Sequence, residues 1–97
     1  MTAPCPTFGF LVDFEFRPGL GGDGRHEFWT EWRAFLDRHA LYSERSEAGA
    51  GPQALVVMGD GAQATESDRV DTRQWLAARP ELSAWSVGDL VDVKQLA

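Results

Sequence analysis

The sequence FGFLVDFEF at residues 8–16 alternates large apolar side chains with small or polar ones. Four phenylalanines and one valine occupy every second position, and the carboxylates of Asp13 and Glu15 lie between them. Because successive side chains of a β-strand point to opposite faces, this pattern predicts a strand with one buried face. Burial of each large apolar side chain stabilises a fold by roughly 1.5–3 kcal/mol, so we expect this strand at the centre of the core.

Length and composition indicate one small globular domain. The chain has 97 residues, of which 43% are apolar and 25% are charged, as is typical of proteins with a single core. We expect residues 8–97 to form this domain and residues 1–7 to be a short disordered segment. The sequence has no apolar run of membrane-spanning length, no secretory signal and a single cysteine, Cys5. These features predict a cytoplasmic protein that does not enter a membrane.

The charge balance disfavours direct binding to nucleic acid. Fifteen acidic residues against nine basic ones give a net charge of −6, and the basic residues are spread along the chain. Met1 to Thr7 includes no basic residue that could contact a phosphate backbone. Such contacts supply most of the affinity of proteins for nucleic acid, so we expect direct nucleic-acid binding to be weak.

A loop, a helix and a hairpin are expected after the first strand. Residues 18–24 are rich in glycine and proline and predict a loop, which is followed by apolar residues at helical spacing over 25–39. Asp23 is the expected N-cap of this helix. Residues 41–45 and 54–58 have the pattern of two strands joined in a hairpin.

A second helix is expected from Thr65 to about Arg79. Thr65 and Asp68 have the spacing of a capping box, and Pro80 cannot continue the helix. Its inward stripe is expected to consist of Val70, Gln74 and Ala77, with Trp75 and Leu76 nearby.

Residues 82–93 alternate loosely and predict a closing strand, bent at Gly88, with Trp85 in the core. The resulting element order, β-α-β-β-α-β, indicates an α+β fold of the ferredoxin-like class. Two right-handed split crossovers convert this order into a four-stranded antiparallel sheet with both helices on one face. The other face of the sheet is then open.

No residue cluster predicts catalysis, a cofactor or a metal. Gly19 to Gly24 spell G-x-G-x-x-G between a strand and a helix, but Asp23 stands where a phosphate would bind, so a loop is favoured over a nucleotide site. Asp13 and Glu15 lie on a solvated face, which favours a polar surface over acid–base chemistry. His26 and His39 lie thirteen positions apart, too far to share a metal without other ligands.

The features that remain favour a surface for a partner. Leu11, Asp13 and Glu15 share the open face of the predicted sheet, and the expected helix positions of Trp29 and Trp75 leave both rings partly exposed. These five residues are the candidate partner-binding site. Homodimerisation through the edge of the first or the last strand is also open.

Several short segments, in order and spacing, resemble the YggL family of small bacterial proteins described as binding the 50S ribosomal subunit. These segments are Gly9-Phe10, Phe35-Leu36, Val56-Val57, Trp75-Leu76, Arg79-Pro80-Glu81-Leu82 and Val87-Gly88-Asp89-Leu90-Val91-Asp92. The resemblance implies a cytoplasmic accessory protein without known catalytic activity that docks on the large subunit.

Two hypotheses follow. The first is a non-enzymatic binding protein of the YggL type that meets the 50S subunit or another protein through the open sheet face or the strand at Val87–Val93. The second is a small-ligand-binding or catalytic domain on the same fold, with the loop at Gly19–Gly24 as its lid.

Overall fold

A computed structural model gives the fold of the chain and describes residues 7–46 and 52–96. The fold is mixed α+β, as the sequence predicts. Most of the N-terminal segment 1–7 and of the connection before the third strand lies outside the described residues. The elements in chain order are β1 (Phe8–Phe16), α1 (Gly22–Arg38), β2 (Leu41–Arg45), β3 (Gln53–Gly59), α2 (Glu66–Ala77), β4 (Leu82–Val87), β5 (Val91–Asp92) and a 3₁₀ turn, η1 (Val93–Leu96).

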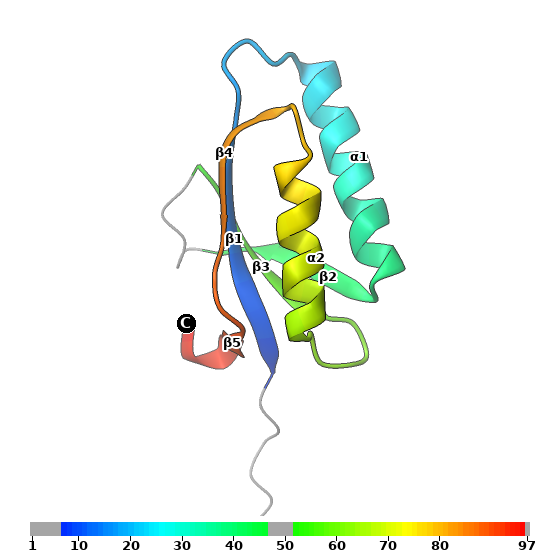
Figure 1. The fold of residues 1–97 in the computed structure, drawn as a ribbon, viewed down its shortest axis with the longest axis vertical. Helices are drawn as coiled ribbons and strands as arrows, with labels where there is room; N and C mark the ends of the chain where they lie inside the picture. The colour runs from blue at the N-terminus through cyan, green and yellow to red at the C-terminus, as the bar shows by residue number, and fades with distance from the viewer. Residues whose placement is uncertain (1–6, 47–51, 97) are drawn as a thin grey trace, which may run out of the picture.

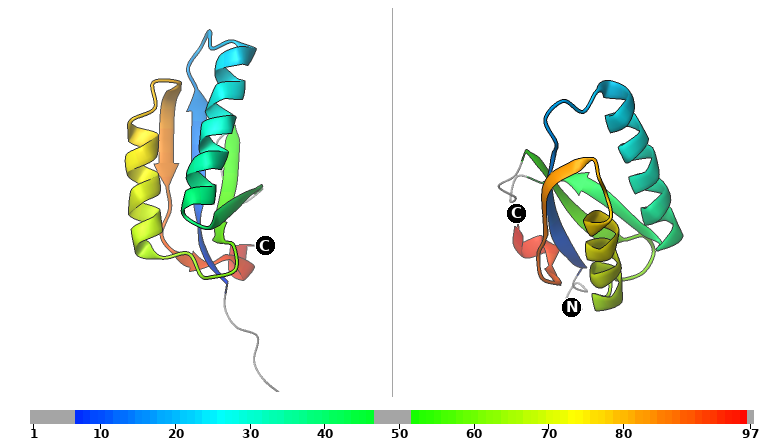
Figure 2. Two further views of the ribbon diagram at one scale, coloured as in Figure 1. Left: turned by 90° about the vertical axis from the view of Figure 1, so that its right-hand side faces the viewer. Right: turned by 45° about the horizontal axis from the view of Figure 1, so that its top comes forward.

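The strands form one antiparallel sheet in the order β2-β3-β1-β4. Both helices lie on the same side of this sheet (Figures 1 and 2). β1 is central, because β3 pairs with one of its edges and β4 and β5 pair with the other. A dimer through the edge of the first strand, which the sequence left open, is therefore excluded by the pairing of β1.

The closing strand differs from its prediction. Instead of one bent strand over 82–93, the chain forms β4 and β5, so the described residues form a sheet of five strands and not four. Gly88 lies at the break, where its N–H donates to the carbonyl of Leu11 at 2.8 Å and its own carbonyl accepts from Arg69 Nε at 2.6 Å. Because a helix side chain holds this carbonyl, the regular strand ends before Gly88.

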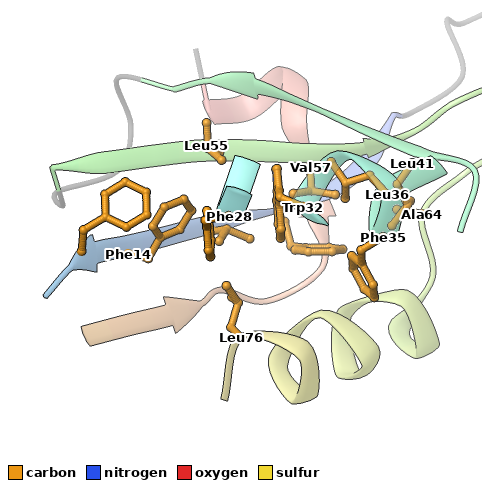
Figure 3. Packing of buried hydrophobic residues seen from close by; sticks show 13 residues of the cluster. Phe14, Phe28, Trp32, Phe35, Leu36, Leu41, Leu55, Val57, Ala64 and Leu76 are labelled. Atoms are coloured by element: carbon orange, nitrogen blue, oxygen red, sulfur yellow. The ribbon is translucent and has the colours of Figure 1, made fainter. Parts of the chain in front are cut away.

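The core lies between the sheet and the helices. Every second side chain of β1 points into it, so Phe10, Val12 and Phe14 are at most 2% exposed. The ring of Phe14 lies 5.0 Å from that of Phe28 and 6.3 Å from that of Trp32, both on α1. Figure 3 shows these rings in one layer with Leu55 and Val57 of β3 on one side and Leu76 of α2 on the other. The predicted apolar face of the first strand is thus confirmed from Phe10 onward, whereas Phe8 at its start is 37% exposed.

Helix α1 starts three residues earlier than predicted. Its N-cap is Gly21, and the expected cap, Asp23, lies in the first turn instead. The N–H of Arg25 donates to the carbonyl of Gly21 at 3.1 Å, which closes this additional turn. Leu20 packs against the core and over Gly24. This packing favours a helix that begins at Gly22, although glycine has a low intrinsic helix propensity.

Helix α2 has the predicted cap but a different inward face. The Thr65 N–H donates to Asp68 Oδ2 at 2.9 Å and the Asp68 N–H donates to Thr65 Oγ1 at 3.1 Å, which confirms the capping box. The buried side chains are Thr72 and Leu76, whereas the expected stripe of Val70, Gln74 and Ala77 is exposed. Burial of Thr72 is possible because its hydroxyl donates to the carbonyl of Asp68 at 2.8 Å.

The start of β1 depends on a glycine. A methyl group on Gly9 would collide with the carbonyl oxygen of Val57 and lie 2.7 Å from Val93 Cγ1. The absent side chain thus lets β3 and the C-terminal turn η1 approach β1 on the face away from the helices.

We expect Phe14→Ala to lower the free energy of unfolding by about 3–5 kcal/mol, because the ring is 2% exposed and its removal leaves a cavity. Phe8→Ala on the same strand is the matched control, since this ring is 37% exposed and should cost less than about 1 kcal/mol. Urea unfolding of both variants measures the difference. Equal losses would contradict the difference in burial between these two rings, which share one face of β1.

Gly9→Ala should destabilise the chain by about 1–3 kcal/mol, because the added methyl group forces β3 or η1 away from β1. Gly22→Ala, whose methyl group meets no atom within 4 Å, should be neutral or slightly stabilising. Thermal unfolding followed by circular dichroism compares the two. A neutral Gly9→Ala would show that the close approach is not required.

Candidate functional site

The five predicted partner-binding residues lie on two sides of the molecule. Leu11, Asp13 and Glu15 belong to the face of β1 that points away from the helices, whereas Trp29 and Trp75 belong to the helix layer. The structure therefore brings the first three together and does not bring the two tryptophans to them.

Both tryptophans are half-buried and pack within the ring cluster. The Trp29 ring lies 5.5 Å from that of Phe14. The Trp75 ring stacks on Phe35 at 5.4 Å and joins α2 to α1. The guanidinium of Arg79 lies 4.5 Å from the centre of the Trp75 ring and also forms an ion pair with Glu31 of α1. These contacts give Trp75 a clear role in holding the two helices together.

The open face of the sheet is acidic where β1 and β4 meet. Asp13 lies opposite Ser86, and Glu15 lies opposite Ala84. Glu15 is exposed, whereas Leu11 and Asp13 are half-buried. A shallow hollow of about 250 Å³ runs along this seam, with both carboxylates in its lining. Such a surface can accept basic side chains, but it does not enclose a small molecule.

Sequence reasoning missed a larger hollow between α1 and β2. It measures about 560 Å³, and its lining includes Trp29, Arg33, Asp37 and Tyr42. At its base the indole N–H of Trp32 donates to the Ser43 hydroxyl at 3.2 Å. The signal for this hollow was Trp29, which stands beside the inward stripe of its helix. Its described lining contains side chains of both charges but no nucleophile paired with a general base.

Trp85 lies elsewhere than predicted. It is opposite Phe14 and therefore on the helix side of the sheet, but it is 36% exposed because β4 is an edge strand. It lines a hollow of about 300 Å³ together with the exposed face of α2, at Val70, Arg73, Gln74 and Ala77. The apolar residues that the sequence assigned to the core thus form part of a surface groove.

The glycine-rich segment does not form the predicted loop over its whole length. Gly22 and Gly24 lie within α1, and the loop is restricted to the residues before them. Gly19 has a φ of 86°, which only glycine adopts readily. Asp23 in the first helical turn places a negative charge where a phosphate would need a positive field.

The predicted helix included His39, whereas in the structure His39 is the C-cap of α1, and its N–H donates to the Leu36 carbonyl at 3.0 Å. Its Nδ1 lies 3.7 Å from a carboxylate oxygen of Asp68 and 3.8 Å from one of Asp71, so it links the helices. Among residues 7–46 and 52–96, no three histidine, cysteine, aspartate or glutamate side chains are grouped closely enough to hold a metal. Within the same residues, neither helix combines the length and the apolar composition that crossing a bilayer requires.

A comparison with protein families identifies the family to which the chain belongs. The model of the family described as YggL 50S ribosome-binding protein matches residues 6–94. The chain belongs to this family. The sequence resemblance is thereby confirmed, whereas no curated protein and no solved structure matches the chain.

The segments by which the sequence resembles the YggL family have structural roles in this member. Trp75 and Leu76 join α2 to the core, and Val87 to Asp92 carry the chain from β4 to β5. The family pattern therefore identifies the scaffold. It does not by itself mark the surface that meets a partner.

Packing and surface roles can be separated by substitution. Trp75→Ala should lower the free energy of unfolding by about 2–4 kcal/mol, because it removes contacts with both Phe35 and Arg79. Glu15→Gln should change it by less than about 0.5 kcal/mol, because this side chain is exposed. Chemical denaturation tests both expectations. A stable Trp75→Ala protein would contradict the packing role.

Proposed function

We propose that this YggL family member is a non-enzymatic protein that binds the 50S ribosomal subunit. The observation that carries the proposal is the family match over residues 6–94, because the family is described by this activity. Ribosome binding would also place the chain in the cytoplasm.

The surface chemistry supports binding over catalysis. The carboxylates of Asp13 and Glu15 lie on an open sheet face along a shallow hollow, and the described residues form no enclosed pocket around them. The acid and base groups of enzymes are usually desolvated in a cleft. A shallow charged seam is better suited to a macromolecule.

The contact surface in this proposal includes Leu11, Asp13 and Glu15. The negative charge of this seam opposes contact with phosphates, so the direct neighbour on the subunit would be a ribosomal protein and not ribosomal RNA. Trp29 and Trp75 would support this surface from the helix layer and would contribute to binding only through the stability of the fold.

We also propose that residues 8–97 form one domain of the ferredoxin-like class. The strand order β2-β3-β1-β4 and the two crossovers through α1 and α2 support this class. The short β5 is then an addition at the edge of the four-stranded arrangement.

Sedimentation tests the proposed function. The full chain is mixed with purified 50S subunits, with 30S subunits or with buffer, and each mixture is centrifuged through sucrose at low and at physiological salt. We expect the chain to sediment with 50S subunits and to remain near the top with 30S subunits or alone. Absence of the chain from the 50S fraction at both salt concentrations would overturn the proposal.

A further inference from the structure

Strand β4 forms an edge of the sheet that carries little of the usual protection. It is the last strand in the order β2-β3-β1-β4, and no described strand pairs with its outer side. Its sequence, Leu-Ser-Ala-Trp-Ser-Val at residues 82–87, contains neither a charge nor a proline, and Ser83 to Ser86 are all exposed. Natural edge strands usually carry charges, prolines or bulges that prevent pairing with another chain. The pairing of β4 with β1 shifts register between Ala84 and Leu82, so residues 84–87 are the regular part of this uncharged edge. This part is suited to accept a further strand.

On the helix side, this edge borders a mostly apolar groove, whose lining also includes Arg73 and Gln74 of α2. Trp85 of β4 and Val70 of α2 are 36% and 39% exposed, and both line the hollow of about 300 Å³ between the two elements. Figure 2 shows α2 beside β4 along its length. A strand that pairs with β4 would direct every second side chain towards this groove. Apolar side chains at those positions would cover Trp85 and Val70.

On the opposite side, the same edge borders carboxylates. The lining of the hollow of about 250 Å³ beside β4 includes Asp13, Glu15, Ala84 and Ser86, together with Phe14, Pro52 and Trp85. The intervening side chains of an added strand would point towards this acidic seam. Lysine or arginine at those positions would meet opposite charge, so the two sides of β4 together select a segment that alternates apolar and basic residues.

A second copy of the chain fits this edge less well. Self-pairing would place one uncharged β4 against another and would bring a second pair of Asp13 and Glu15 carboxylates to the seam. No basic residue of β4 would then face those carboxylates. Charge complementarity thus favours a foreign basic segment over a homodimer.

We propose that the partner binds as an extended segment of alternating apolar and basic residues that adds as a strand to the free edge of β4. The inference rests on the proposed function, because it names the kind of segment of a ribosomal protein that this family member binds. Backbone hydrogen bonds to β4 supply the docking geometry, while Trp85 with Val70 and Asp13 with Glu15 select the side chains.

The test uses a fluorescein-labelled peptide of eight residues that alternates valine and lysine. Fluorescence anisotropy with the full chain should show saturable binding, at least tenfold tighter than that of a valine–glutamate peptide of the same length. Methylation of alternate backbone nitrogens in the valine–lysine peptide should abolish binding, because it removes the donors that pair with the edge strand. Equal binding of the methylated peptide would overturn strand addition.

Three variants locate the site. Ala84→Lys should weaken peptide binding at least tenfold, because it places a positive charge on the edge beside Glu15. Glu15→Gln should weaken it roughly threefold, as expected for one exposed ion pair. Glu44→Gln, at an exposed carboxylate on the far edge strand β2, should leave it unchanged. Equal effects of Glu15→Gln and Glu44→Gln would show only unspecific attraction and would contradict the site.

Two further measurements separate this inference from the proposed function. If Ala84→Lys folds normally by circular dichroism and still sediments with 50S subunits as the wild type does, the edge is not the contact and the inference fails while ribosome binding stands. If the wild-type chain binds the peptide but not 50S subunits, the edge site stands and the ribosomal function fails. Ultracentrifugation that shows a dimer converted to a monomer by Ala84→Lys would assign the edge to a second copy and contradict the inference.

Discussion

Burial of one face of β1 is the constraint on which the rest of the structure depends. Phe10, Val12 and Phe14 are removed from water only when both helices cover the same side of the sheet. The aromatic rings of α1 and α2 then meet above the strand and lock the helices to each other, as the stacking of Trp75 on Phe35 illustrates. The remaining elements take positions that this packing permits.

The same constraint divides the molecule into a side used for packing and a side that we propose for contact with the partner. Helix α1 and the inner face of α2 are used for packing, so their aromatic residues stabilise the fold. The opposite sheet face carries Asp13 and Glu15, and no described strand pairs with the outer edge of β4. A protein of this size can thus offer a binding surface without a deep pocket, because an edge strand supplies directional backbone groups and its flanking hollows supply selectivity.

Much of the fold could be predicted from local patterns. The alternation over residues 8–16 gave the exact bounds of β1, and the spacing of Thr65 and Asp68 gave the cap of α2. Local patterns could not give the rotation of α2, because burial of Thr72 depends on a hydrogen bond within the helix and on packing against distant strands. The division between β4 and β5 depends on Arg69, nineteen residues away from Gly88, and is likewise invisible to local spacing.

The candidate site was accessible to sequence analysis only in part. The period of β1 placed Leu11, Asp13 and Glu15 on one face, but it could not show which strands would lie beside them. Trp85 was in phase with the core, yet its strand lies at an edge, where one side has no neighbour among the described elements. Strand order arises from contacts between distant parts of the chain. Because this order places β4 at the edge, Trp85 and Val70 line a surface groove.

The most direct measurement is a cryo-electron microscopy reconstruction of the chain on the 50S subunit. The account predicts that β4 and the seam at Asp13 and Glu15 face the ribosome, with a basic extended segment beside β4 and with α1 exposed to solvent. A complex in which α1 and the groove between α1 and β2 face the ribosome, with β4 in solvent, would contradict it.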